Sequence, residues 1–370
     1  MEVFRRYGFD KPLAGAAFGL ILLGIVMVFS ATGVMSGDKY HQTFYFFINQ
    51  VLGVVVGIGL VLWLVSVKQA FYRNKHIVYL LLAVTLGLLV LCLLMPPIAR
   101  TNRWVQFSGI RFQPSELAKI SLVLYLAFYF EQKKEKLGDI KALFLPAGVL
   151  LLYVLLILKE PDFGTALMIF AVCAMLFFLA GVSLRHLACL GLMFSVLFAF
   201  FLFSSPYRRD RVLGFISPDK DPLGQTFQVN QAKLAVGSGG LLGVGLGFST
   251  QKLYFLPCAH TDFIYAIIGE ELGLLGTVVT LLLFLVFLWR GLVITMRAPT
   301  SSARLLAAGL TLIFGVQALL NISVALGIGP PKGVPLPLIS FGRSSLICSF
   351  LAIGMLLNIS QRKTLSGEHR

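Results

Sequence analysis

Long stretches without a single Asp, Glu, Lys or Arg constrain the fold of this chain more than any other feature. A helix needs roughly 20 apolar residues to cross the hydrocarbon core of a membrane. Such stretches occur at Leu13–Gly37, Tyr40–Val67, Ile77–Ala99, Ala142–Leu158, Phe163–Leu184, His186–Tyr207, Leu272–Trp289, Leu305–Pro331 and Ser344–Gln361. With 58% hydrophobic and 13% charged residues, a chain of 370 residues cannot fold as a soluble domain. The sequence therefore predicts a polytopic membrane protein.

A tenth span is predicted at Pro114–Phe130, which is apolar apart from Glu116 and Lys119. The expected fold is an all-α integral membrane protein, a bundle of ten transmembrane helices with a long extracytoplasmic loop, about residues 204–262, between helices 7 and 8. The first span is long and nine more follow, so an uncleaved helix is expected there and not a signal peptide. Residues 1–370 contain no linker or repeat and are expected to form a single domain.

Lys and Arg are concentrated on one side of the predicted bundle. That side carries Arg5, Arg6, Lys11, Lys68, Arg73, Lys75, Lys133, Lys134, Lys136, Lys141, Arg185, Arg290, Arg297, Arg304, Arg362, Lys363 and Arg370. Short loops rich in these residues resist translocation, so this side and both termini are expected in the cytoplasm. The loop at 204–262 is then extracytoplasmic.

The net charge of +15 invites a nucleic-acid interpretation, but nearly half of the basic residues lie outside the cytoplasmic loops. No module of interleaved aromatic and basic residues appears either, so anionic lipid and phosphate are the expected partners. The five cysteines have no metal-type spacing and lie mostly in apolar spans. They are interpreted as small hydrophobic residues, not as ligands or disulfides.

Glu116 and Lys119 lie three residues apart and therefore on one face of the predicted helix. Within hydrocarbon they must turn toward the bundle and most simply toward each other. A structural ion pair is one interpretation, since Pro114 suits the first turn and Glu116 the positive end of the helix dipole. The other is a polar cleft in which Lys119 contacts phosphate and Glu116 orients it or binds a cation. The residues alone leave both open.

The long loop offers further candidates. Arg208 and Arg209 follow a span directly, where guanidinium groups match phosphate oxygens or anchor the chain at the interface. The run Gln225–Leu234 predicts a short interfacial helix. The glycines between positions 237 and 247 suit close packing and sharp turns at least as well as a phosphate cradle.

Asp262 ends the loop directly before another apolar run. A carboxylate there would lie beside low-dielectric protein and still reach a water-facing substrate. The competing interpretation is helix capping, because Thr261 and Asp262 are both favoured capping residues. Glu270 and Glu271 follow closely, and the sequence does not decide whether they face a helix or a cleft.

A last polar segment, Pro331–Ser340, contains three prolines and carries Lys332 and Ser340. Because proline fixes its backbone angle, this segment is expected to be rigid and extended. It would form either a stiff wall of a binding groove or a plain re-entrant packing element.

Several motifs occur in order along the chain, namely Gln113–Lys119, Tyr207–Arg211, Asp221–Gly224, Gln251–Pro257, His260–Ile264, Gly269–Gly273 and Pro331–Ser340. In this respect the chain resembles the SEDS (FtsW/RodA/SpoVE) family over essentially its whole length. The Pro-Lys-Gly at 331–333 is similar to the division and sporulation members, with division favoured. The resemblance implies an inverting glycosyltransferase that polymerises lipid II, the undecaprenyl-diphosphate-linked disaccharide-peptide, on the outer face of the bacterial cytoplasmic membrane.

The resemblance also implies roles for individual residues. Asp262 corresponds to the essential acid, the candidate general base. The residues expected to bind substrate are Glu116, Lys119, Arg208, Arg209, His260, Thr261, Lys332 and Ser340. A divalent cation, Mg²⁺ or Mn²⁺, could be held by Glu116 or Asp262. Two positions depart from the family pattern, Cys258 in place of a common Glu and Arg343 in place of a Gly, and they leave the shape of the groove open.

The expected partners are a class B penicillin-binding protein, which is a transpeptidase, and other membrane proteins of the division machinery. Two alternatives to a polymerase remain. A lipid II flippase would also need a polar cavity in a membrane bundle. A non-catalytic scaffold would recruit the transpeptidase through its spans and would not depend on Asp262.

Overall fold

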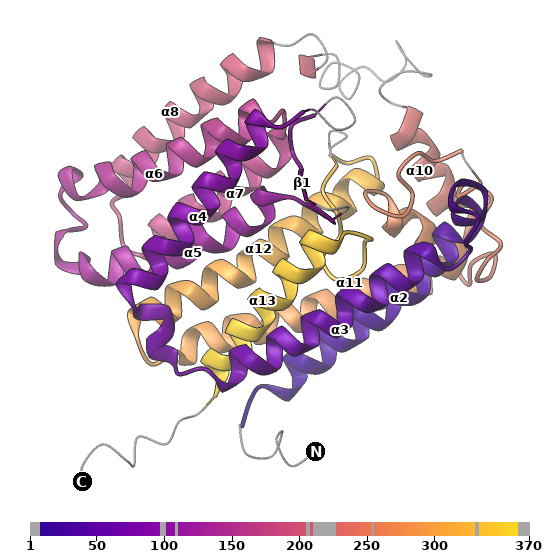
Figure 1. Ribbon diagram of the computed structural model, residues 1–370, viewed down its shortest axis with the longest axis horizontal. Coiled ribbons are helices and arrows are strands. Elements are labelled where there is room, and N and C mark those ends of the chain that lie inside the picture. The colour runs from indigo at the N-terminus through magenta and orange to yellow at the C-terminus, as the bar shows by residue number, and fades with distance from the viewer. Residues whose placement is uncertain are drawn as a thin grey trace.

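The computed structural model describes residues 8–96, 101–107, 110–204, 208–209, 227–253, 255–329 and 333–361. These residues are mostly helical, with one short antiparallel hairpin (Figure 1). The elements are α2 (Lys11–Tyr40), α3 (Tyr45–Ser66), η1 (Gln69–Arg73), α4 (Lys75–Leu94), β1 (Val105–Phe107), β2 (Ile110–Phe112), α5 (Pro114–Gln132), η2 (Lys134–Lys136), α6 (Ile140–Lys159), α7 (Phe163–Leu179), α8 (Leu184–Phe203), α10 (Phe227–Ser238), α11 (Ile264–Arg297), α12 (Ser301–Ala325) and α13 (Arg343–Ser360).

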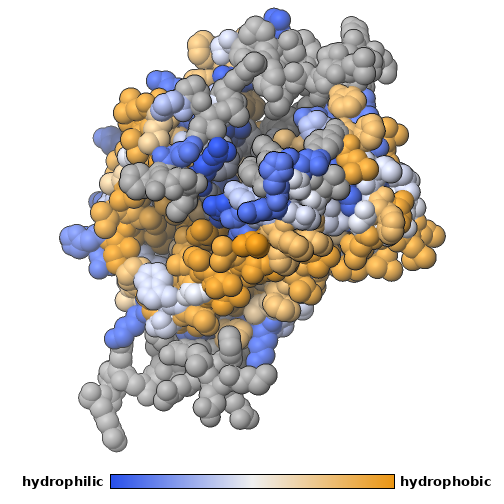
Figure 2. All heavy atoms as spheres, turned by 45° about the vertical axis from the view of Figure 1, so that its right-hand side comes forward, coloured by the Kyte–Doolittle hydropathy of each residue, from blue (hydrophilic) through white to orange (hydrophobic). Residues whose placement is uncertain are grey.

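Among the described residues, 8 helices are long and apolar enough to cross a membrane, and α7 is a shorter apolar helix. Figure 2 shows an apolar band across one face of the molecule, with hydrophilic side chains above and below it. The predicted all-α membrane bundle is thus confirmed. The count of ten spans stays a prediction, because the charged α5 lies outside that group of 8.

α5 lies at the centre of the bundle. It packs against α4, α7 and α12, and 16 of its 19 residues are buried. A helix that is buried all round belongs to a core. Gly309 on α12 allows a close approach, because a Cβ there would lie 2.4 Å from a methyl group of Val123 on α5. This packing carries Glu116 and Lys119 into the interior and places them against α12.

The interface between α3 and α13 also depends on glycine. A Cβ at Gly57 of α3 would lie 2.1 Å from the ring of Phe350 on α13, and a Cβ at Gly53 would lie 3.0 Å from Leu346. The two helices therefore run in close contact. The loop at residues 333–341, which leads into α13, lies at the candidate site.

We expect Gly57→Ala to lower the free energy of unfolding by about 1–3 kcal/mol, because the added methyl group overpacks the interface with Phe350. Gly59→Ala is the matched control on the same helix, since nothing lies within 4 Å of a Cβ there. Thermal unfolding of both variants in detergent checks this. Equal melting temperatures would show that α3 and α13 pack less closely than described.

α11 (Ile264–Arg297) consists of two helical segments separated by a kink at Gly273, where φ is 65°. The predicted span Leu272–Trp289 corresponds to the second segment. Glu270 and Glu271 lie in the first segment, where both carboxylates are bonded within the protein. Sequence patterns cannot show such partners in advance.

The segment before α11 packs onto this break. α10 confirms the short helix predicted at Gln225–Leu234, and it packs against α11. Gly243, with φ of 83°, lies so close to Glu271 that a Cβ would sit 2.1 Å from the Glu271 carbonyl oxygen. Gly239 contacts the Gly269 carbonyl in the same way. Gly239 and Gly243 therefore serve close packing and tight turns, the alternative to a phosphate cradle in the sequence analysis.

Candidate active site

The turn that carries Asp262 is held by one carbonyl group. The Cys258 carbonyl accepts hydrogen bonds from the backbone N–H groups of Thr261 (3.1 Å) and Asp262 (3.0 Å). Cys258 has a φ of 58°, an unfavourable conformation for a residue with a side chain. The capping position of α11 is Phe263, not Thr261 or Asp262. Asp262 is partly exposed, with the first buried turn of α11 directly behind it.

A second loop, residues 333–341, lies against this turn. Gly333 faces the Asp262 carboxylate so closely that a Cβ there would lie 2.7 Å from Oδ2. The Ser340 hydroxyl donates to the Thr261 carbonyl at 2.5 Å and accepts from the Leu336 N–H at 2.8 Å. The loop is mostly buried and packs against the turn that carries Asp262, and its role as the wall of a binding groove stays a prediction. Ser340 is 5% exposed, and its hydroxyl is used to hold the two segments together.

His260 joins the same assembly through its ring and its backbone. Its carbonyl accepts from the Phe341 N–H at 3.0 Å, and its ring lies 5.2 Å from that of Phe46 on α3. Phe46 also packs edge-on against Phe341, with ring centroids 4.9 Å apart. The loop before α11, the loop before α13 and the start of α3 therefore meet around Asp262.

α12 supplies two amide side chains that sequence reasoning missed. The Asn321 Nδ2 donates to the Asp262 carbonyl at 2.8 Å and to the Val334 carbonyl at 2.7 Å. One turn earlier, the Gln317 Nε2 donates to the Pro335 carbonyl at 2.9 Å. Amides four residues apart in an apolar run were the available signal, because polar groups within a membrane helix face partners. Asn321 thus clamps both loops that frame Asp262.

Glu116 and Lys119 form the predicted ion pair at 2.8 Å, with both side chains 5% exposed. The Lys119 ammonium also donates to the Gln317 Oε1 at 3.0 Å. The cavity beside them measures about 10 Å³, about the space of one water molecule. In this conformation Lys119 therefore contacts a carboxylate and an amide, and the cavity has no room for a phosphate. Gln317 links this ion pair to the loop beside Asp262, because it bonds both Lys119 and the Pro335 carbonyl.

The predicted arginines lie elsewhere on the same end of the bundle. Arg208 bonds the Phe201 carbonyl at 2.8 Å and stacks over the Phe201 ring at 5.8 Å, whereas Arg209 is exposed. Desolvation and the positive charge of Arg103 lower the pKa of Arg208. Arg103, in the segment before β1, is therefore a second guanidinium near it. Lys332 lies outside the described residues.

Cys258 and Arg343 occupy the two positions that depart from the family pattern. Desolvation, and next the Asp262 charge, raise the pKa of the Cys258 thiol, so it stays neutral. Arg343 is the first residue of α13. The following Ser344 accepts a hydrogen bond from the Gln113 N–H at 3.0 Å. This bond ties the first turn of α13 to the residue that precedes α5.

Glu270 and Glu271 both have structural partners. Glu270 accepts from the Ser249 hydroxyl and from the Thr250 N–H at 2.9 Å. Glu271 pairs with Lys252 at 2.7 Å and accepts from Ser30 of α2. These carboxylates fasten residues 249–252 onto α11 and α2.

Glu160, between α6 and α7, is fully buried, and its carboxylate oxygens accept no hydrogen bond from the described residues. Arg103 bonds the carbonyls of Glu160 and Pro161 instead. Burial and the nearby charge of Asp162 raise the pKa of Glu160 to about 8, against a smaller opposing effect of Arg103. The folded protein therefore keeps this carboxyl protonated at neutral pH.

We expect the stability of the protein to fall as pH rises toward 8 on account of Glu160. Between a pKa of 4.5 in the unfolded chain and about 8 in the folded one, only the unfolded state loses the proton. The free energy of unfolding then falls by up to about 1.4 kcal/mol per pH unit and levels off above pH 8. Glu160→Gln should remove this slope, so thermal unfolding should favour the variant at pH 8 and converge with wild type near pH 5. Parallel curves would contradict the assignment.

The described residues contain no group of three His, Cys, Asp or Glu side chains that could hold a metal ion. Mg²⁺ is commonly bound by one or two carboxylates together with substrate phosphates. Of the two carboxylates predicted to hold a cation, Glu116 is occupied by Lys119. Asp262 lies at the partly exposed turn, and its role in holding a cation stays a prediction.

Comparison with known proteins gives consistent matches along the chain. The probable peptidoglycan glycosyltransferase FtsW of Geobacter sulfurreducens is 39% identical over 356 residues, covering 96% of this chain and 95% of that protein. Stage V sporulation protein E of Bacillus subtilis is 36% identical over 347 residues, covering 92% and 94%. A solved structure described as a peptidoglycan synthase complex that coordinates polymerization and crosslinking aligns with a TM-score of 0.78 at 29% identity, covering 95% of this chain and 98% of that one.

The model of the FtsW/RodA/SpoVE family, described as cell cycle proteins, matches residues 12–365. The match begins at the first residues of α2 and ends beyond α13, so it includes every element around Asp262. It agrees with the relatives and with the solved structure in fold and extent. This multi-pass membrane protein therefore belongs to the FtsW/RodA/SpoVE family, as its motifs indicate.

Proposed function

We propose that this chain is an inverting peptidoglycan glycosyltransferase that polymerises lipid II on the outer face of the cytoplasmic membrane during cell division. One observation carries the proposal. A partly exposed carboxylate, Asp262, stands at the end of the bundle, framed by two loops that Asn321 and Ser340 hold together. The relatives named as peptidoglycan glycosyltransferases supply the reaction class.

In this proposal Asp262 acts as the general base. It takes the proton from the acceptor sugar hydroxyl as that oxygen attacks the anomeric carbon of the donor. The undecaprenyl diphosphate leaves from the opposite face of the sugar, which inverts the anomeric centre. The two loops give the carboxylate a fixed position, because the backbone carbonyls of Asp262 and Val334 both accept hydrogen bonds from Asn321 of α12. His260 and Thr261, on the same turn, would contact the sugars.

The departing diphosphate needs positive charge as it forms. Arg208 and Arg209 follow α8 directly and would meet the phosphates near the headgroup plane, with Arg103 close by. Gly333 lies against the Asp262 carboxylate. Lys332, the residue before it in the sequence, is therefore a further candidate for contacting the diphosphate. A divalent cation bound to the diphosphate, Mg²⁺ or Mn²⁺, would supply additional positive charge at the leaving group.

The proposal includes a partner and an orientation. The solved complex that aligns with this chain couples polymerization to crosslinking, which supports a class B penicillin-binding protein as the partner here. Other division membrane proteins would join them. The concentration of Lys and Arg supports placing both termini in the cytoplasm and Asp262 outside it.

Proteoliposomes that contain lipid II, this chain and the class B transpeptidase test the proposal against its alternatives. Partner and chain are reconstituted together, because a chain that opens only when the partner binds would be inactive alone. Polymeric glycan that a muramidase digests supports the polymerase. Lipid II that crosses the bilayer without polymerising would indicate a flippase. Transpeptidase recruitment with neither activity would indicate a scaffold.

We expect Asn321→Leu to reduce strand formation at least tenfold, since the carbonyls of Asp262 and Val334 would lose their donor and the turn its position. Asn358→Leu is the matched control. Asn358 on α13 is equally buried and donates to the carbonyls of Leu64 and Val67, away from Asp262. Both substitutions should lower the melting temperature by a similar amount, and only Asn321→Leu should reduce strand formation. Equal activities would show that the clamp does not position Asp262.

A further inference from the structure

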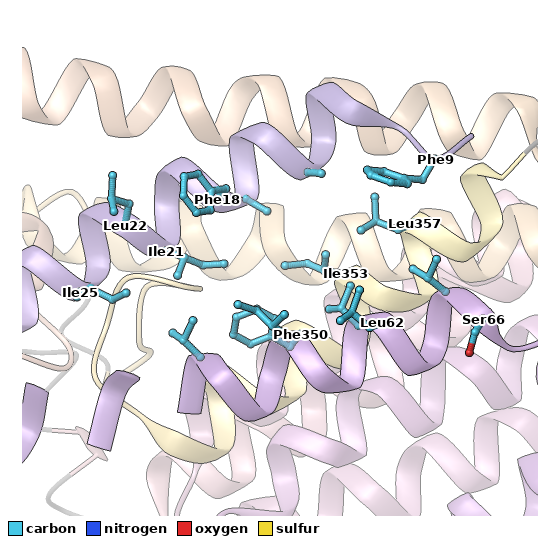
Figure 3. A pocket seen from close by; sticks show the side chains of 16 residues that line it. Phe9, Phe18, Ile21, Leu22, Ile25, Leu62, Ser66, Phe350, Ile353 and Leu357 are labelled. Carbon is cyan, nitrogen blue, oxygen red and sulfur yellow. The ribbon is translucent and has the colours of Figure 1, made fainter. Parts of the chain in front are cut away.

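A groove separate from Asp262 opens between α2, α3 and α13 (Figure 3). Its volume is about 490 Å³, within the range of small-molecule sites. Phe18, Ile21 and Leu22 of α2 face Phe350 and Ile353 of α13 across it, and Ser66 is the one polar residue among those that line it. Phe18 and Leu22 are exposed on the apolar surface of the bundle. The groove therefore opens sideways toward the hydrocarbon of the membrane.

The helix packing explains why the groove exists. α3 packs closely against α13 at Gly57 and Gly53, whereas α2 packs mainly against α11. α2 and α3 meet again at one end, where Phe29 stacks on Phe44 at 5.6 Å. Between that contact and the first turn of α2, the two helices leave an apolar space that no described side chain fills.

The length of the groove matches one leaflet of a bilayer. Along α2 it extends from Ala14 to Ile25, and along α3 from Val54 to Ser66. At 1.5 Å per residue these segments measure about 17–18 Å. Half the hydrocarbon thickness of a membrane is about 15 Å. An extended acyl chain from one leaflet therefore fits the groove along its axis.

The polar end of the groove is cationic. Lys11 and Lys68 are both exposed, and each lies two residues beyond a residue that lines this end, Phe9 and Ser66. The neighbouring acid, Asp10, is already paired with Arg290 at 2.5 Å. Basic residues at the cytoplasmic mouth of a cleft between membrane helices favour anionic lipid headgroups.

This end lies opposite Asp262. Ser30, near the far end of α2, bonds Glu271, which follows Asp262 closely in the chain. From Lys11 to Ser30 α2 rises about 29 Å, roughly the thickness of the hydrocarbon core. The groove and the candidate active site therefore belong to different leaflets.

We propose that this groove binds one acyl chain of an anionic phospholipid of the cytoplasmic leaflet, with the headgroup phosphate at Lys11 and Lys68. The site does not depend on the proposed polymerase activity. Its occupant is a resident membrane lipid that fills the space between α2 and α3. Bound lipid stabilises the folded protein by mass action, by an amount that grows with the logarithm of the ratio of lipid concentration to Kd.

Native mass spectrometry of the purified full chain, titrated with phosphatidylglycerol or phosphatidylcholine of the same acyl chains, tests the proposal. Wild type should retain one phosphatidylglycerol about tenfold more tightly than phosphatidylcholine, from two lysines near the headgroup. The double variant Lys11→Gln, Lys68→Gln should bind the two lipids equally. Ile21→Trp fills the groove and should weaken retention of both at least fivefold.

Val55→Trp is the matched control, because Val55 is an exposed residue of α3 outside the groove. Ile58→Trp, at an exposed lining residue, replaces Ile21→Trp if that variant unfolds at a lower temperature without lipid. Equal retention by the groove and control variants would overturn the proposal. So would equal affinity of wild type for the two lipids, or displacement of phosphatidylglycerol by an undecaprenyl phosphate at equal concentration.

Discussion

Asp262→Asn is expected to reduce the initial rate of glycan strand formation at least about a hundredfold, the lower end of what a positioned general base contributes. The substitution keeps the size of the side chain and removes its basicity. Two of the bonds that place this residue use its backbone, from the Asp262 N–H to Cys258 and from Asn321 to the Asp262 carbonyl, and the substitution leaves both in place. The fold and the affinity for lipid II should therefore remain.

Two controls separate loss of chemistry from loss of structure at Asp262. Thermal unfolding should show a melting temperature close to that of wild type, and binding of fluorescent lipid II should be retained within about threefold. A variant that forms strands at the wild-type rate would remove Asp262 from the chemistry. A variant that no longer binds lipid II would assign it to substrate binding instead.

Lys119→Met is expected to lower the free energy of unfolding by about 3–5 kcal/mol, because it leaves the Glu116 carboxylate buried without its cation. The Gln317 Oε1 loses its donor as well, and Gln317 is the link from this pair to the Pro335 carbonyl. Strand formation should fall at least tenfold. Denaturation in a mild detergent and the strand assay measure the two effects.

A double variant, Glu116→Gln with Lys119→Met, separates stability from function at this pair. Without a buried charge, most of the lost stability should return. Activity should stay low, because Gln317 still lacks its contact with α5 and no longer supports the 333–341 loop. Full activity in the double variant would show that the pair is purely structural.

The bundle could be predicted because hydrocarbon imposes a simple rule on sequence. Backbone polar groups in a membrane must be satisfied within the helix, so long charge-free stretches become helices. The charge-free rule missed the first segment of α11, because Glu270 and Glu271 lie in it and are bonded to local partners. The hairpin of β1 and β2 also escaped prediction, because strands of 3 residues give too little periodicity.

Sequence motifs were enough to name candidate site residues but not to show how those residues are assembled. The spacing of Glu116 and Lys119 was enough to predict their pairing, because residues three apart share a helix face. Asn321 remained hidden, since its two partners are backbone carbonyls of loops distant in sequence. The resemblance places Ser340 among the substrate-binding residues, and the sequence could not show that its hydroxyl bonds the backbone of Thr261 and Leu336. Pairing between segments far apart in sequence leaves no trace in either segment alone.

The most direct test of the central claim is a gel of glycan strands made from purified lipid II. The full chain is assayed in complex with its class B transpeptidase, whose crosslinking is blocked by a β-lactam, so that any polymer comes from glycosyl transfer. The account predicts a ladder of strands from wild type and none from an equally folded, partner-bound Asp262→Asn complex. Ladders of equal length and intensity from both would contradict it.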